Sequence, residues 1–123
     1  MTRRLMGAAG LTMMLAAGLF AADSKPGTVI HVISVKWKAE ATPAQIEKAI
    51  KGAEALPAEY RGIVRVWTKP IKKQLPEGYN HVIVMEFASE DALKNYADSA
   101  AQKKWYEVYM PIREESRTSD IAN

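Results

Sequence analysis

The segment from residue 78 to residue 96 constrains the fold of this chain more than any other stretch. It begins with Gly-Tyr-Asn, which favours a tight turn, and the strand predicted at 79–87 is apolar on both of its faces. Ser89 follows as a favourable N-cap with two acidic residues in the first helical turn, so a helix is expected up to Tyr96. A strand that is apolar on both faces needs a partner layer on each side.

The rest of the chain predicts three more strands and two more helices. Strands are expected at 28–38, 62–68 and 112–121, the last of them mostly polar. Thr42 is a good N-cap and Pro43 suits the first helical position, so a helix is expected to start there and to end at Pro57. A further helical segment is expected from Ala100 to Met110.

This order of elements, β-α-β-β-α-β with an additional helical segment, predicts a ferredoxin-like α+β unit with one sheet and helices on one of its faces. Alternation along the strands then places a set of apolar side chains on the opposite face, namely Ile30, Val32, Val64, Val66, Val82 and Val84. In the same scheme Arg65 shares the other face with Ile63 and Trp67. An exposed apolar sheet face normally marks an interface, so we expect a symmetric homodimer, with the two sheets packed face to face as a dimeric α/β barrel.

The N-terminus has the layout of a secretory signal peptide. Arg3 and Arg4 precede an apolar run at 5–20, and the polar segment 23–27 follows. The run is shorter than the ~20 residues that a membrane-spanning helix needs. We therefore expect a signal peptide at 1–22, a single domain at 28–121, and a secreted or periplasmic protein with no membrane attachment after cleavage. An uncleaved N-terminal anchor and a twin-arginine signal are the alternatives.

Charge and cysteine content exclude several classes of function. The chain has a formal net charge of +3, and residues 1–22 hold two arginines and no acidic residue, so the processed chain carries only +1. No case for nucleic-acid binding or for an anionic membrane surface remains. The absence of cysteine excludes disulfides, thiolate metal sites, a cysteine nucleophile and a lipid anchor on cysteine.

The two histidines of the chain, His31 and His81, share the parity of the apolar side chains that face the helices. They either line a pocket, where His81 could polarise a carbonyl group or act as a base with Tyr96, or serve as structural histidines bonded to the backbone or to a tyrosine. Trp105, Tyr106 and Tyr109 either cover a flat apolar ligand or pack in the core. A metal would need a third ligand, and Glu86 has the opposite parity, so no metal site is expected.

Several short segments, in this order and spacing, resemble the stress-responsive A/B barrel family of the dimeric α/β barrel superfamily. The resemblance extends from about Val29 to Tyr109, and it is carried by His-Val-Ile-Ser-Val-Lys-Trp-Lys at 31–38, Ala-Leu-Pro at 55–57, Gly-Tyr-Asn-His at 78–81, Val-Met-Glu-Phe-Ala-Ser at 84–89 and Ala-Leu-Lys-Asn-Tyr at 92–96. It implies the same dimeric barrel that the strand pattern predicts.

Similarity to a plant polyketide cyclase of that family implies a pocket between the sheet and the helices. The expected lining is His31, Ile33, Val35, Ile83, Trp105 and Tyr109. By the same similarity, His81 and Tyr96 are the candidate catalytic residues. The histidine that serves the cyclase as general base is replaced by Gln102, which cannot accept a proton at neutral pH, so the acid–base pair is incomplete.

The first hypothesis is therefore a secreted homodimer that binds a small apolar or aromatic molecule, or has a stress-related role, without established catalysis and without a cofactor. The alternative is a cofactor-free cyclase-, isomerase- or monooxygenase-like enzyme that uses His81 and Tyr96. Because the superfamily includes haem-handling members, haem binding through a histidine is a third hypothesis.

Overall fold

The computed structural model describes residues 27–69 and 76–123. The predicted signal peptide at 1–22 lies outside the described residues. Within them, no helix is both long enough and apolar enough to cross a membrane.

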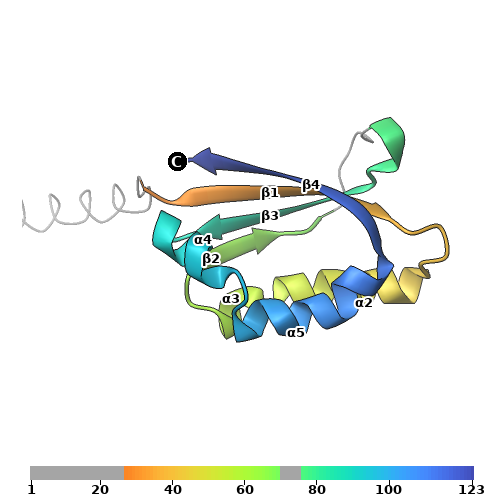
Figure 1. Cartoon of the computed structure of the whole chain (residues 1–123), viewed down its shortest axis with the longest axis horizontal. Helices are drawn as coiled ribbons and strands as arrows, with labels where there is room; N and C mark the ends of the chain where they lie inside the picture. Colours follow the sequence, from red (N-terminus) through yellow and green to blue (C-terminus); the bar gives the residue numbers. More distant parts are fainter. Residues whose placement is uncertain (1–26, 70–75) are drawn as a thin grey trace, which may run out of the picture.

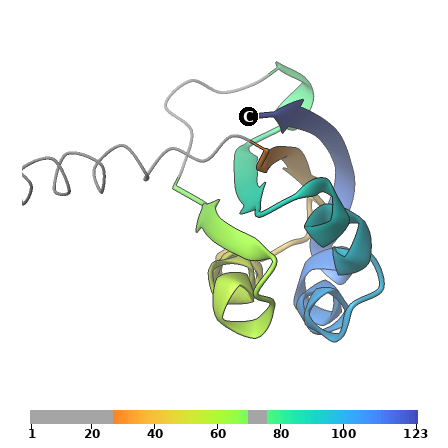
Figure 2. The ribbon, with the colours of Figure 1, turned by 90° about the vertical axis from the view of Figure 1, so that its left-hand side faces the viewer.

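The chain forms one four-stranded antiparallel sheet with its helices on one face (Figures 1 and 2). The strands lie in the order β2-β3-β1-β4. Figure 2 shows α2 and α5 side by side beneath the sheet. The predicted ferredoxin-like α+β fold is confirmed. Its elements are β1 (Val29–Trp37), α2 (Pro43–Glu54), α3 (Leu56–Glu59), β2 (Ile63–Trp67), a 3-10 turn at Pro76–Gly78, β3 (His81–Phe87), α4 (Glu90–Tyr96), α5 (Ala100–Tyr109), a 3-10 turn at Met110–Ile112 and β4 (Arg113–Ala122).

Helix α2 begins where the sequence predicts, with a complete capping box. The Thr42 hydroxyl accepts from the backbone N–H of Gln45, and the Gln45 side chain accepts from the backbone N–H of Thr42. The prediction that Pro57 ends the helical segment was wrong. The helix breaks at Ala55, and Pro57 lies in the first turn of α3. A backbone N–H in that turn has no acceptor within the helix, so proline is tolerated there.

The central strands β1 and β3 alternate as predicted. Ile33 and Val35 of β1 lie opposite Ile83 and His81 of β3, and the apolar side chains of this face pack on α2 and α5. On the other face, Val32 lies directly opposite Val84. The core is therefore the layer between the sheet and the helices, while the second apolar face of β1 and β3 is turned away from it.

Strand β2 departs from the predicted alternation. A bulge between Ile63 and Arg65 inserts Val64 as an extra residue, so Arg65 lies opposite Glu86 and Val66 opposite Met85. Val66 consequently packs against the core, whereas Arg65 and Trp67 lie on the open face. The prediction that Val66 lies on the open face, with Arg65 and Trp67 on the other, was wrong, because one inserted residue reverses every position that follows it.

Strand β4 pairs with β1 along its whole length. Ser116, Thr118 and Asp120 lie opposite Val35, Ile33 and His31, so these three polar side chains are on the helix side of the sheet. The edge strand that completes the sheet therefore turns a polar row toward the interior.

Candidate functional site: a cavity between the sheet and helices α4 and α5

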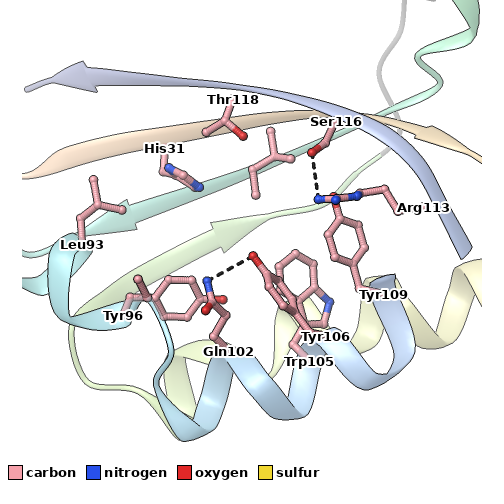
Figure 3. A pocket seen from close by; sticks show the side chains of 12 residues that line it. His31, Leu93, Tyr96, Gln102, Trp105, Tyr106, Tyr109, Arg113, Ser116 and Thr118 are labelled. Carbon is pink, nitrogen blue, oxygen red and sulfur yellow. Dashed lines mark hydrogen bonds between the residues drawn. The ribbon is translucent and has the colours of Figure 1, made fainter. Parts of the chain in front are cut away.

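A cavity of about 210 Å³ lies between β1 and β4 on one side and α4 and α5 on the other (Figure 3). Its walls combine aromatic rings, small aliphatic groups and a few polar side chains. The lining residues are His31, Ile33, Leu93, Tyr96, Ala97, Gln102, Trp105, Tyr106, Tyr109, Arg113, Ser116 and Thr118.

Two capped helices aim their side chains at this space. Ser89 caps α4 by accepting from the backbone N–H of Ala92, and Ser99 caps α5 by accepting from that of Gln102. Between them Asp98 adopts a left-handed conformation with φ 62°, which carbonyl-bearing side chains such as Asp tolerate best. This sharp connection directs Tyr96, at the end of α4, and Gln102, in the first turn of α5, into the same cavity (Figure 3).

The aromatic wall of the cavity is rigid. Trp105 stacks on Tyr109 with the ring centres 4.2 Å apart and the planes 8° from parallel. The Trp105 indole N–H also donates to the carbonyl oxygen of Ala49 in α2 at 2.9 Å, which fixes the ring against rotation. The site therefore offers a preformed flat surface.

The hydroxyl groups of Tyr96 and Tyr109 are buried and have no hydrogen-bond partner among the described residues. Tyr109 has Ser116 and Arg113 nearby, but neither completes a bond of ordinary geometry. A buried polar group left unpaired costs roughly 1–3 kcal/mol. Burial raises the pKa of Tyr96, and Tyr106 and Tyr109 add to the effect. Both hydroxyls are thus protonated donors at neutral pH.

Gln102 stands where the cyclase that the sequence resembles has its general-base histidine. Its side-chain oxygen accepts from the backbone N–H of Asp98 at 2.8 Å, and its Nε2 donates to the Tyr106 hydroxyl at 3.2 Å (Figure 3). Because that hydroxyl accepts from Gln102, its own proton remains available to a third group. Gln102 therefore orients a donor and does not take a proton.

His31 is paired across the sheet with Asp120. The distance from His31 Nδ1 to Asp120 Oδ1 is 2.5 Å, and a carboxylate only accepts, so the ring donates from Nδ1. Nε2 is the ring nitrogen that remains, and among the described residues it has no hydrogen-bond partner. In the neutral ring the proton then sits on Nδ1, and Nε2 is the acceptor nitrogen.

The sequence of residues 29–123 matches the family model of the stress responsive A/B barrel domain. The chain belongs to this family. The resemblance seen in the sequence is thereby confirmed, and the match includes the edge strand β4, which the sequence-based resemblance did not reach. No match was found among curated proteins.

Solved structures share the fold of this A/B barrel domain. A hydroxynitrile lyase from Passiflora edulis has a TM-score of 0.72 at 16% identity, over 80% of this chain and 95% of that chain. A dimeric ferredoxin-like protein of unknown function from Thermobifida fusca has a TM-score of 0.68 at 18% identity, over 80% and 93%. SnoaB, a cofactor-independent oxygenase from Streptomyces nogalater, has a TM-score of 0.56 at 14% identity, over 78% and 90%. At these identities the likeness concerns the fold alone.

The A/B barrel domain brings most of the predicted pocket residues together. His31, Ile33, Trp105 and Tyr109 line the cavity, as does the candidate catalytic Tyr96. Val35 and Ile83 do not line it. Both are completely buried in the hydrophobic core, although Ile83 lies opposite Ile33 and Val35 lies opposite Ser116, which do line the cavity.

His81 does not meet Tyr96 in this cavity. It lines a separate surface hollow together with residues of α2 and the end of β2. Its Nδ1 accepts a hydrogen bond from the Trp37 indole N–H at 2.7 Å, which leaves the ring proton on Nε2. Burial lowers the pKa of His81. The geometry is that of a structural histidine with one satisfied bond.

The sequence did not point to several of the cavity residues. Leu93, Ala97, Arg113, Ser116 and Thr118 are among the lining residues, and Asp120 acts through His31. The sequence feature that could have indicated these residues was the polarity of the segment 112–121. An edge strand whose inward positions are Ser, Thr and Asp lines a polar wall rather than an apolar core.

The described residues hold no cluster of metal ligands, and the cavity beside His31 is small. Within 27–69 and 76–123, no group of three His, Asp or Glu side chains could hold a metal ion. The cavity beside His31, at about 210 Å³, is smaller than the ~300 Å³ at which pockets for drug-sized ligands begin, so it is too small for a haem.

Proposed function

We propose that this A/B barrel domain binds a small, partly apolar ring compound in the cavity between the sheet and helices α4 and α5. The observation that carries the proposal is the pair of buried hydroxyls of Tyr96 and Tyr109, which have no partner among the described residues. Such groups destabilise a protein unless a ligand or an ordered water molecule pairs with them. A bound oxygen or nitrogen acceptor would receive their protons, while the stacked rings of Trp105 and Tyr109 would cover the face of the ligand.

The size of the cavity limits the ligand to a single ring with one or two polar substituents. An apolar cavity of about 150 Å³ is known to hold benzene, and drug-sized ligands occupy about 300–1,000 Å³. The present cavity, at about 210 Å³, lies between these values.

The proposal includes a homodimer outside the cytoplasm. The open face of the sheet carries Val32 opposite Val84 and the 44% exposed Trp67, and a second copy would bury this surface. A relative of the same fold is described as dimeric. The basic and apolar layout of residues 1–22 supports secretion or a periplasmic location.

Calorimetric titration with single-ring compounds tests the binding proposal. Thr118 lines the cavity from β4, so Thr118→Phe fills the space, whereas Thr118→Val replaces the hydroxyl with a methyl group of similar size. We expect binding by the wild type and by Thr118→Val, and at least a ~10-fold loss with Thr118→Phe. Equal affinity in all three proteins would place the ligand elsewhere and contradict the proposal.

The second candidate function is a cofactor-free enzyme, and the His31–Asp120 pair favours it. His31 takes the place of His81 in this hypothesis, because it shares the cavity with Tyr96. Nε2 of His31 would remove a proton from a carbon next to a carbonyl group. The electron pair of the broken C–H bond would move to the carbonyl oxygen, where the Tyr96 O–H donates a hydrogen bond. Two relatives of the same fold are a lyase and a cofactor-independent oxygenase.

Deuterium uptake by acetophenone, followed by NMR in heavy water, tests the enzyme hypothesis. We expect exchange of the methyl protons above the buffer rate, and its loss in His31→Asn, which lacks Nε2. His81→Asn serves as the control and should exchange like the wild type. Exchange that is equal to buffer, or unchanged in His31→Asn, would reject the hypothesis.

A further inference from the structure

We infer that the ligand of this cavity is an anion, a monocyclic carboxylate whose carboxylate group is bound by Arg113. This inference rests on the proposed function and names the chemical class of the ligand. It follows from the charge at one end of the cavity, where β4 begins (Figure 3).

Arg113 is a half-buried cation without an acidic partner in the described part of the chain. Its only side-chain hydrogen bond is to the Ser116 hydroxyl, with the Arg113 NH1 to Ser116 Oγ distance 3.1 Å (Figure 3). Its guanidinium carbon also lies 5.6 Å from the centre of the Tyr109 ring. A guanidinium has five N–H donors in a planar fork, so most of its capacity is unused here.

The nearby acidic residues are directed elsewhere by the register of β4. Glu114 lies at the bulge of the β1–β4 ladder and pairs with Lys36 at 3.1 Å. Glu115 lies opposite Lys36, on the open face of the sheet. Asp120 lies on the cavity side but is bound to His31. The side chain of Asp98 is exposed to solvent. None of these carboxylates pairs with Arg113.

The groups around Arg113 suit a carboxylate. Arg113 and Ser116 line the cavity together with Tyr109, whose buried hydroxyl is an unpaired donor. A carboxylate accepts up to about four hydrogen bonds and is the usual partner of an arginine fork. From this end, the ring of the ligand would extend along Ile33 and Trp105 toward the second unpaired donor, Tyr96.

The test is calorimetric titration of the chain without the predicted signal peptide at 1–22. The two probes are benzoate and benzamide, which have nearly the same shape and differ in charge. Charge-assisted hydrogen bonds to arginine predict a preference for benzoate on the order of ten- to a hundred-fold. Arg113→Gln should remove this preference and leave benzamide binding nearly unchanged. Arg117→Gln is the matched control. It removes the same charge from the same strand, but Arg117 pairs with Glu77 on the other side of the sheet.

The outcomes separate the inference from the proposed function. A tenfold or larger preference for benzoate that is lost in Arg113→Gln and kept in Arg117→Gln supports the inference. Equal affinities for the two probes in the wild type overturn it while leaving the proposed function in place. Binding of neither probe contradicts both. The wild-type ratio tests the charge of the ligand even if the Arg113 variant fails to fold, and a preference kept in a folded Arg113→Gln overturns the role of Arg113.

Discussion

His31 and Asp120 lie 89 positions apart in the sequence, yet their side chains meet with His31 Nδ1 2.5 Å from Asp120 Oδ1. The contact joins β1 to β4 at directly opposed positions of the ladder. It shows why the edge strand is polar on its inner side, since that side supplies the groups that orient a cavity histidine. The carboxylate fixes which ring nitrogen carries the proton and leaves Nε2 at the cavity wall.

We expect Asp120→Ala to release the His31 ring. In the wild type the proton of the neutral ring should sit on Nδ1, and in the variant a large share should move to Nε2, as seen in long-range ¹H–¹⁵N NMR spectra. The pair is partly exposed, so the free energy of unfolding should fall by less than about 1 kcal/mol. Ser119→Ala, next to it on the opposite face, should change neither property. An unchanged tautomer in Asp120→Ala would mean that the contact does not orient the ring.

We expect Tyr96→Phe to stabilise the ligand-free protein, by up to about 1 kcal/mol, because it removes a buried hydroxyl without a partner. Tyr60 provides the matched control. Its ring packs against Tyr96 at 5.5 Å, but its hydroxyl donates to the Ala92 carbonyl oxygen at 2.6 Å. Tyr60→Phe should therefore lower the free energy of unfolding by roughly 0.5–1.5 kcal/mol. Urea denaturation of both variants checks the difference, and a loss of stability in Tyr96→Phe would contradict the reading of this hydroxyl as a ligand donor.

We expect His81 to make the protein less stable in acid. Burial lowers its folded-state pKa from the ordinary value of 6.5, and protonation of Nδ1 would also break the bond from Trp37. As pH falls through 6.5, the unfolded chain takes up the proton before the folded one does, so the free energy of unfolding decreases until the folded-state pKa is passed. His81→Asn removes the titration and keeps an acceptor for Trp37. Its stability should decline less than that of the wild type between about pH 7.5 and about pH 5. Parallel curves for the two proteins would count against a buried, neutral His81.

We expect Val84→Glu to convert the proposed dimer to a monomer. Val84 lies opposite both Val32 and Trp67 on the open face, so a carboxylate there would be buried without a partner in the interface. Ala44→Glu adds the same charge at an exposed position in the first turn of α2 and should leave the mass unchanged. Light scattering after size-exclusion chromatography measures the molar mass of both variants. A wild type that is monomeric at micromolar concentration would refute the dimer directly.

The fold was largely predictable because the alternation of β1 and β3 reflects burial on both faces of central strands. Strand β2 was not, since the bulge at Val64 arises from pairing with β3 and leaves no local mark in a run of β-branched residues. One inserted residue then reversed the predicted faces of Arg65, Val66 and Trp67.

The site was predictable only in part, because parity assigns a face of the sheet but not a position along it. His31 and His81 share a face, yet β3 runs antiparallel to β1, and His81 lies opposite Val35 at the far side of the core from the cavity. The placement of Arg113 and Asp120 depends on the register of β4 against β1, which is a long-range property. Tyr96 was predicted as a cavity residue because the helix pattern and the family resemblance both pointed to it.

The central claim is that a ring compound binds between the sheet and α5, and the three tryptophans test it in one measurement. Trp105 walls the cavity, Trp37 lies in the core bonded to His81, and Trp67 is exposed on the open face. In a ¹H–¹⁵N correlation spectrum titrated with benzyl alcohol, the indole signal of Trp105 should shift and saturate, while those of Trp37 and Trp67 stay in place. A titration in which the Trp105 signal does not move, or in which only the Trp67 signal moves, would contradict the claim.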